Sequence, residues 1–109
     1  MARKKESEIQ SEIIKYLKKQ GIFCWRNNNT AVYDPKINGY RSFTGLKGVP
    51  DILGILPGGI FIGVEVKTPR GKQSADQVLF ERRCKRLGGV YIVARSVKDI
   101  TDNIKDHLG

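Results

Sequence analysis

Apolar side chains recur along this chain first with the spacing of a helix and then with the spacing of strands. Between residues 6 and 19 the apolar positions are Ile9, Ile13, Ile14, Tyr16 and Leu17. Residues at these intervals lie on one face of a helix, and Gly21 favours the end of that helix. The next segment, 22–27, reads IFCWRN and predicts a strand because aromatic and β-favouring residues dominate it.

A β-hairpin, a further strand and two more helices are predicted in the second half of the chain. Two apolar runs, 51–56 and 60–67, flank Pro57-Gly58-Gly59 as the strands of a hairpin flank its turn. Ser74 favours the N-terminus of a helix that runs from Ala75 to about Leu87. The remaining elements are a strand at 90–94 and a helix at Val97–Leu108.

The order of these elements predicts one α/β domain. The segment 28–47 carries Asn, Gly, Pro and Asp among scattered aromatic residues, which predicts a polar loop or an irregular hairpin. The chain has no repeat or low-complexity linker, so we expect a single compact domain over residues 1–109, with a mixed β-sheet flanked by helices. Cys24 and Cys84 lack the spacing of metal ligands and are expected to be buried free thiols.

The charge of the chain indicates a polyanionic partner. Twenty Lys and Arg oppose eleven Asp and Glu, which gives a net charge of +9. A domain this basic most often binds nucleic acid, with an anionic membrane surface as the second choice. No apolar run approaches the roughly 20 residues that span a bilayer, and no apolar segment follows the basic N-terminus as in a signal peptide. We therefore expect a cytoplasmic protein that binds nucleic acid and no membrane.

Two carboxylates and an amine interrupt the apolar hairpin at the end away from its turn. If the turn consists of residues 57–59, the register places Asp51 directly opposite Glu65. Lys67 shares their face of the sheet, and we expect that face to continue into the core through Leu53, Ile55 and Phe61. A turn one residue shorter or longer would place the two carboxylates on opposite faces.

A close pair of carboxylates at Asp51 and Glu65 needs a compensating positive charge. Side chains opposite each other on neighbouring strands have Cβ atoms about 5 Å apart, and like charges there destabilise a sheet. A divalent cation bound through oxygen atoms is the simplest compensation, with Mg²⁺ the natural candidate. The alternative is a solvent-facing hairpin end on which Glu65 and Lys67 form a weak ion pair.

The predicted helices place two more polar side chains on apolar faces. Glu6 falls near the centre of the apolar face of the first helix, where it either complements the helix dipole or points toward a specific partner. Gln77 shares a face with Phe80 and Cys84 at helical spacing. Such an amide is either a structural hydrogen-bonding group or part of a site.

These residues follow one another in the order of a nuclease motif. Asp51, Glu65 and Lys67 have the spacing D-x13-E-x-K after Pro50, which resembles the PD-(D/E)XK nuclease superfamily. The chain resembles in particular the VRR-NUC (virus-type replication-repair nuclease) family. ESEIQSEIIKYL is similar to its E-x-x-I-Q opening, GVPDILG to its G-x-P-D motif, and VEVKTPRGKQSADQ to its E-x-K motif with a following Gln. The resemblance covers nearly the whole chain, although the segment 28–47 matches no family motif.

The resemblance implies a restriction-endonuclease-like PD-(D/E)XK core and a phosphodiesterase that uses Mg²⁺ or Mn²⁺ and no small-molecule cofactor. Asp51 and Glu65 would ligate the metal with a backbone carbonyl next to Glu65, and Glu6 would act through water or as an outer ligand. Lys67 would polarise the attacking water or neutralise charge on the phosphate. Gln77 would orient the water, the lysine or a phosphate, and the expected product is a broken DNA strand.

Basic residues near this site are expected to contact DNA. Arg70 and Lys72 follow Lys67 closely, and Arg26 ends the first predicted strand, so each is placed to bind a phosphate. Trp25 is expected in the core rather than as a platform for stacked bases. Short stand-alone members of the family are associated with viruses and phages. Their likeness to junction resolvases suggests a homodimer, in a phage or bacterial cell, that acts on branched DNA such as four-way (Holliday) junctions.

Two other functions fit the same residues. One is a non-catalytic basic DNA-binding module in which the acidic residues are incidental and Mg²⁺ only screens charge. The other is a nuclease built on the same site that cuts flap DNA, linear DNA or RNA. Cleavage that depends on a divalent metal excludes the first, and the ranking of substrates decides the second.

Overall fold

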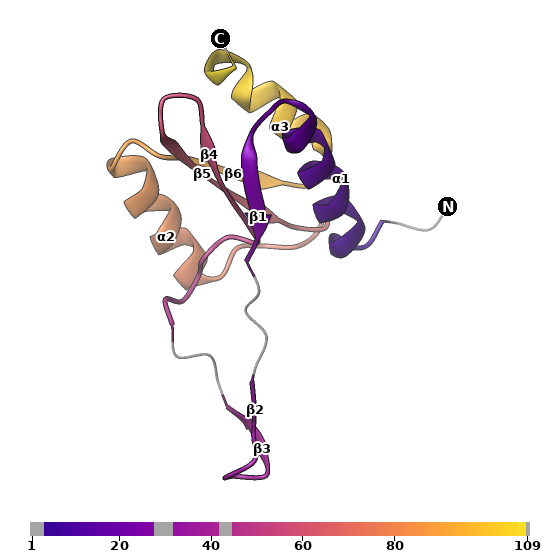
Figure 1. The fold of residues 1–109 in the computed structure, drawn as a ribbon, viewed down its shortest axis with the longest axis vertical. Coiled ribbons are helices and arrows are strands. Elements are labelled where there is room, and N and C mark those ends of the chain that lie inside the picture. The colour runs from indigo at the N-terminus through magenta and orange to yellow at the C-terminus, as the bar shows by residue number, and fades with distance from the viewer. Residues whose placement is uncertain (1–3, 28–31, 42–44, 109) are drawn as a thin grey trace.

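A mixed four-stranded sheet in the order β1-β4-β5-β6 forms the centre of the molecule (Figure 1). The computed structural model describes residues 4–27, 32–41 and 45–108. β1, β4 and β5 are antiparallel, whereas β6 is parallel to β5 and is reached through α2. The elements are α1 (Glu6–Lys19), β1 (Phe23–Arg26), β2 (Val32–Asp34), β3 (Gly39–Arg41), β4 (Ile52–Leu56), β5 (Ile60–Val66), α2 (Ala75–Arg86), β6 (Val90–Ala94), α3 (Val97–Ile104) and a 3-10 turn (Lys105–His107). The predicted single α/β domain with a mixed sheet flanked by helices is confirmed.

Helices cover both faces of the sheet. α1 and α3 lie against one face and α2 against the other (Figure 1). The main core lies on the α1/α3 side, because the apolar faces of these two helices meet there. Its fully buried side chains are Ile13, Leu17, Ile52, Leu56, Ile62, Val64, Val66, Ile100 and Ile104. Each such side chain contributes about 1.5–3 kcal/mol when removed from water, so this side supplies most of the stability.

The turn between β4 and β5 has the three residues that were predicted. Leu56 pairs with Ile60 across it, and the two strands continue in register from there. The same register places Asp51, one residue before β4, opposite Glu65 near the end of β5. The prediction that the two carboxylates share one face of the sheet is therefore confirmed.

The direction of that face was predicted wrongly. Leu53, Ile55 and Phe61 lie on the face of the carboxylates, but this face is turned toward α2 rather than into the main core, and Ile55 remains 42% exposed. The core packs on the alternate residues of both strands. The reason is that α1 and α3 together bury five of their own side chains, whereas α2 buries only that of Cys84.

Trp25 is not a core residue, contrary to the prediction. Burial alternates along β1, where Cys24 faces the α1 side and is buried, while Phe23 and Trp25 are 67% and 41% exposed. β1 lies at one edge of the sheet and β6 at the other, and α2 packs against β6. The outer face of β1 therefore lies too far from α2 to be covered by it.

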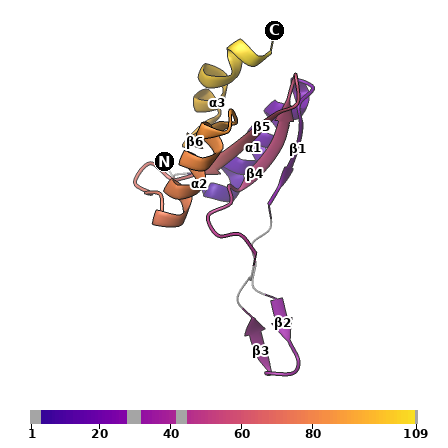
Figure 2. The ribbon, with the colours of Figure 1, turned by 90° about the vertical axis from the view of Figure 1, so that its left-hand side faces the viewer.

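A second, two-stranded hairpin extends away from the sheet (Figures 1 and 2). β2 and β3 pair antiparallel within the segment that predicted a loop or an irregular hairpin. The side chain of Asp34 accepts a hydrogen bond from the backbone N–H of Lys36, and Asn38 has a φ of 48°, so both help the chain to turn. The rest of that prediction concerns residues 28–31 and 42–44, which lie outside the described residues.

The helix ends follow their sequence signals. Ser74 caps α2 as predicted, and its hydroxyl accepts a hydrogen bond from the N–H of Gln77. α3 is shorter than predicted, because it ends at Ile104 and the chain continues as a 3-10 turn. Cys24 and Cys84 are buried free thiols, as predicted. No helix among the described residues has the length and apolar character needed to cross a membrane.

Candidate active site

The segment Gly48–Asp51 is held in place by close packing on both sides. Gly48 has a φ of +77°, and a Cβ at this position would lie 2.3 Å from the carbonyl oxygen of Asp76 in the first turn of α2. Pro50 is fully buried against Gly63 of β5, where an added Cβ would lie 2.7 Å from the proline ring. Both contacts exclude larger residues, so the G-x-P-D sequence fixes where Asp51 enters the sheet.

Asp51 joins three strands at one end of the sheet. Its carboxylate Oδ2 accepts a hydrogen bond of 2.8 Å from the backbone N–H of Val66 in β5. Its backbone carbonyl accepts a hydrogen bond of 2.8 Å from the N–H of Asn27, which follows β1. With these two bonds, the Asp51 carboxylate is held beside that of Glu65 rather than turned into solvent.

Glu65 is a buried carboxylate with one satisfied and one unsatisfied oxygen. The residue is 2% exposed. Oε1 accepts a hydrogen bond of 2.9 Å from Nε2 of Gln77 and lies 3.7 Å from Nζ of Lys67. Among the described residues, Oε2 receives no hydrogen bond from any donor. A buried carboxylate oxygen without a donor is costly, so this oxygen is poised to accept a proton or a cation.

The environment of Glu65 strongly favours its neutral form in the absence of a cation. Burial and the charge of Asp51 together raise the pKa of Glu65 to about 8, against the opposing charge of Lys67. The two carboxylates therefore compete for one positive charge. A divalent cation would satisfy both carboxylates at once.

Lys67 and Gln77 meet at Glu65, as the sequence predicted for members of one site. The Lys67 side chain is 16% exposed and reaches Glu65 from the end of β5. Gln77 uses both ends of its amide, because Oε1 accepts a hydrogen bond from the N–H of Ser74 while Nε2 donates to Glu65. The cap of α2 therefore fixes the amide that holds the buried carboxylate.

Known proteins resemble this chain in sequence and in fold. The profile of the VRR-NUC domain matches residues 4–98. The chain belongs to the VRR-NUC family. A solved VRR-NUC domain shares 25% sequence identity and a TM-score of 0.62, over 94% of this chain and 95% of that chain. A solved VRR-NUC domain protein has 17% identity and a TM-score of 0.71, over 99% and 93%, and supports the fold alone. A comparison with curated proteins found no match.

Glu6 is the third residue that was predicted to bind the metal of this nuclease domain. Glu6 is exposed in the first turn of α1, and its charge is the weakest of the effects that raise the pKa of Glu65. Within residues 4–27, 32–41 and 45–108 no three His, Cys, Asp or Glu side chains gather as metal ligands. Asp51 and Glu65 remain the carboxylate pair on which the candidate site is centred, and the roles of Asp51, Glu65 and Glu6 as metal ligands stay predictions.

The predicted DNA-binding residues Arg26, Arg70 and Lys72 are all exposed. Arg26 is exposed and donates a hydrogen bond to the Ser11 hydroxyl of α1. Arg26 and Glu65 therefore lie on different faces of the sheet. Arg70 and Lys72 are exposed on the loop between β5 and α2. The Arg95 side chain donates to the carbonyl of Gly71 and ties this loop to the end of β6. Their phosphate contacts remain predictions.

A set of hydrogen bonds around Gln73 in this VRR-NUC domain was not predicted from the sequence. The Gln73 amide donates to Oε1 of Glu81 at 3.2 Å and to the hydroxyl of Tyr91 at 3.3 Å, which joins the loop before α2 to α2 and β6. Burial raises the pKa of Tyr91 to about 12, so the hydroxyl keeps its proton. No spacing in the sequence marks these residues, because their contact depends on how α2 packs.

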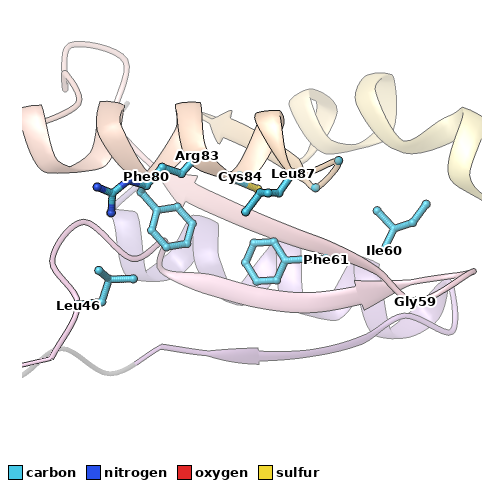
Figure 3. Close-up of a pocket in the computed structure, with 10 residues that line it drawn as sticks. Leu46, Gly59, Ile60, Phe61, Phe80, Arg83, Cys84 and Leu87 are labelled. Carbon is cyan, nitrogen blue, oxygen red and sulfur yellow. The ribbon is translucent and has the colours of Figure 1, made fainter.

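An apolar hollow lies farther along the same side of the sheet (Figure 3). Its volume is about 570 Å³, and α2 and the β4–β5 hairpin form its walls. Phe61 and Phe80 face it, and Arg83 lies at its rim (Figure 3). Neither carboxylate lines it, so the hollow is separate from the metal-binding candidates of this VRR-NUC domain.

Proposed function

We propose that this VRR-NUC domain is a metal-dependent endonuclease that hydrolyses phosphodiester bonds in branched DNA, with four-way junctions as the first candidate. The observation that carries the proposal is the buried pair of Asp51 and Glu65, in which Oε2 of Glu65 has no donor among the described residues. Such a carboxylate pair is costly without a compensating cation. A hard divalent metal ion binds through oxygen ligands of this kind.

The donor set fits Mg²⁺ or Mn²⁺. Asp51 and Glu65 offer carboxylate oxygens, and a backbone carbonyl next to Glu65 completes an all-oxygen set of the kind these ions prefer. Glu6 would act through water or as an outer ligand. The bound ion supplies Lewis-acid chemistry, which activates water and stabilises the charge that develops on the phosphate.

The side chains of this chain then have distinct tasks. Lys67 brings an ammonium group within 3.7 Å of Glu65, so it neutralises charge on the phosphate and polarises the attacking water without transferring a proton. Gln77 holds Glu65 in one orientation through the hydrogen bond to Oε1. Such partners of a metal-binding carboxylate affect affinity and activity strongly even though they do not touch the metal.

The basic surface supports DNA as the substrate. A net charge of +9 attracts a polyanion, and Arg26, Arg70 and Lys72 supply phosphate contacts around the carboxylate pair. We propose a homodimer, since a four-way junction has twofold symmetry and one chain of this size carries one site. A cytoplasmic location, in a phage or bacterial cell, belongs to the same proposal.

Strand cleavage tests the proposal. Labelled four-way junction, flap, linear duplex and RNA are incubated with wild type, Asp51→Asn and Lys67→Ala, each with EDTA, Mg²⁺ or Mn²⁺. We expect metal-dependent cleavage, fastest on the junction, that both variants lose by 100-fold or more, on the order expected for groups acting in the transition state. Binding by all three proteins without cleavage under any metal would overturn the nuclease and leave a DNA-binding module.

A further inference from the structure

Two aromatic side chains lie exposed on the sheet face that carries the carboxylates. Phe23 is 67% exposed and Trp25 is 41% exposed, and their ring centroids are 5.1 Å apart with a tilt of 46°. Ile55, opposite Phe23 on β4, is 42% exposed on the same face. Large apolar side chains that gather on an otherwise charged domain mark a binding surface.

The register places Trp25 next to Asp51. Trp25 pairs with Leu53 on β4, and Asp51 lies two residues from Leu53 on the same face. Diagonal neighbours of this kind on adjacent strands are about 7–8 Å apart. Trp25 is therefore the diagonal neighbour of the residue that the proposed function assigns to the metal, and Phe23 continues the aromatic surface away from it.

We propose that Phe23 and Trp25 form a stacking platform for unpaired bases of the nucleic acid whose phosphate lies at Asp51 and Glu65. The inference rests on the proposed function and deepens it, because it names the feature of the substrate that is recognised. The substrate class is a nucleic acid with unpaired nucleotides next to the scissile phosphate, at a branch, a flap or an end.

Stacking explains selectivity for structure without reading of sequence. Every base has an aromatic face, and stacking on a protein ring contributes about 1–3 kcal/mol per base. Bases inside a continuous duplex already stack on their neighbours and cannot reach Trp25 without unpairing. A platform beside the carboxylate pair thus favours junctions and flaps over intact duplex, whatever their sequence.

The position of the platform favours nucleic acid over a second copy of the chain. A protein seated on Trp25 would also cover Asp51 and block the approach of a phosphate. A nucleic acid seated there instead brings negative charge to the basic domain and its own phosphate to the carboxylates.

Trp25 is the only tryptophan of the chain, so fluorescence excited selectively at the indole reports on this position alone. The experiment titrates metal-free protein in EDTA with a single-stranded oligonucleotide, a blunt duplex and heparin. We expect the single strand to quench the fluorescence, whereas heparin, which has charge but no bases, and the duplex leave it nearly unchanged. A labelled strand that binds by anisotropy without quenching Trp25 would overturn the platform.

Matched variants separate stacking from other roles of this surface. Trp25→Leu keeps an apolar side chain without a ring and should weaken single-strand binding by about 5- to 150-fold, the equivalent of 1–3 kcal/mol. Trp25→Tyr should restore most of the affinity, and Leu87→Ala, at an exposed position beyond the end of α2, should bind as wild type. If Trp25→Leu binds normally, or if its main effect is to dissociate a dimer in sedimentation, the platform is wrong.

These outcomes are distinguishable from failure of the proposed function, because none of them requires cleavage. Quenching by a protein that never cuts DNA would support the platform and overturn the nuclease. Metal-dependent cleavage by a protein whose Trp25 fluorescence is not quenched would support the nuclease and overturn the platform.

Discussion

Gln77 donates a hydrogen bond from Nε2 to Oε1 of Glu65 across 2.9 Å, while its own Oε1 accepts the N–H of Ser74. One side chain thus completes the capping box of α2 and holds the buried carboxylate of the candidate site. Because the amide is used at both ends, its orientation is fixed, and the position of α2 is coupled to that of Glu65.

Gln77→Glu separates these two roles. Glutamate at this position of a capping box accepts the Ser74 N–H as well as glutamine does, so α2 should keep its helical signal in circular dichroism. The new carboxylate cannot donate to Glu65 and repels it instead. We expect cleavage to fall by about 10- to 100-fold, the usual range for a partner of a metal-binding carboxylate. Unchanged cleavage by a folded Gln77→Glu protein would show that this hydrogen bond has no part in the reaction.

Glu65→Gln should stabilise the metal-free protein while abolishing cleavage. The folded state raises the pKa of Glu65 from its ordinary value of 4.5 to about 8, mainly through burial. Between these pH values the folded protein holds a proton that the unfolded chain has released. The stability from this group is therefore fully present below about pH 4.5 and is lost as pH rises through about 8.

Thermal unfolding in EDTA between pH 4 and pH 9 measures this effect. Glu65→Gln and wild type should unfold at similar temperatures near pH 4. As pH rises, the variant should become more stable than wild type. A gain of about 1 kcal/mol corresponds to roughly 4–8 °C in a domain of this size. Parallel curves for the two proteins across this range would mean that Glu65 is not held neutral in the folded state.

Much of this site is predictable because strands and turns obey short-range rules. A three-residue turn and a side-chain period of two suffice to bring Asp51, Glu65 and Lys67 to one face, and the structure has that register. The exposure of Trp25 was not predictable, since it depends on which strand α2 packs against. The bridge from Gln73 to Tyr91 escaped for the same reason, because it joins segments that meet only after folding.

Gly48→Ala tests whether close packing against α2 positions Asp51. Gly48 and Gly88 both have positive φ, at 77° and 89°, but only Gly48 has the backbone of α2 within reach of an added Cβ. Gly88→Ala should therefore lower the free energy of unfolding by only about 1–2 kcal/mol, the cost of a left-handed backbone conformation for alanine. Gly48→Ala should lower the free energy of unfolding in urea clearly more, and should reduce cleavage to the fraction of protein that remains folded. Equal costs at the two positions would contradict the packing argument.

Glu6→Gln and Glu8→Gln form a matched pair in the first turn of α1. Both carboxylates are exposed and both complement the helix dipole, so the two variants should lose similar stability. Of these two carboxylates, only Glu6 contributes to the raised pKa of Glu65. We expect Glu6→Gln to slow metal-dependent cleavage by about 10-fold and Glu8→Gln to cut as wild type. Equal activity of the two variants would exclude Glu6 from the site.

The central claim is that Asp51 and Glu65 bind a divalent cation, and calorimetric titration with Mn²⁺ alone measures it most directly. Wild type, Asp51→Asn and the surface control Glu8→Gln are compared at pH 8, where Glu65 gives up its proton more readily. The account predicts one Mn²⁺ bound per chain in wild type and in Glu8→Gln, and loss of that binding in Asp51→Asn. Mn²⁺ bound equally by all three proteins, or by none of them, would contradict the claim.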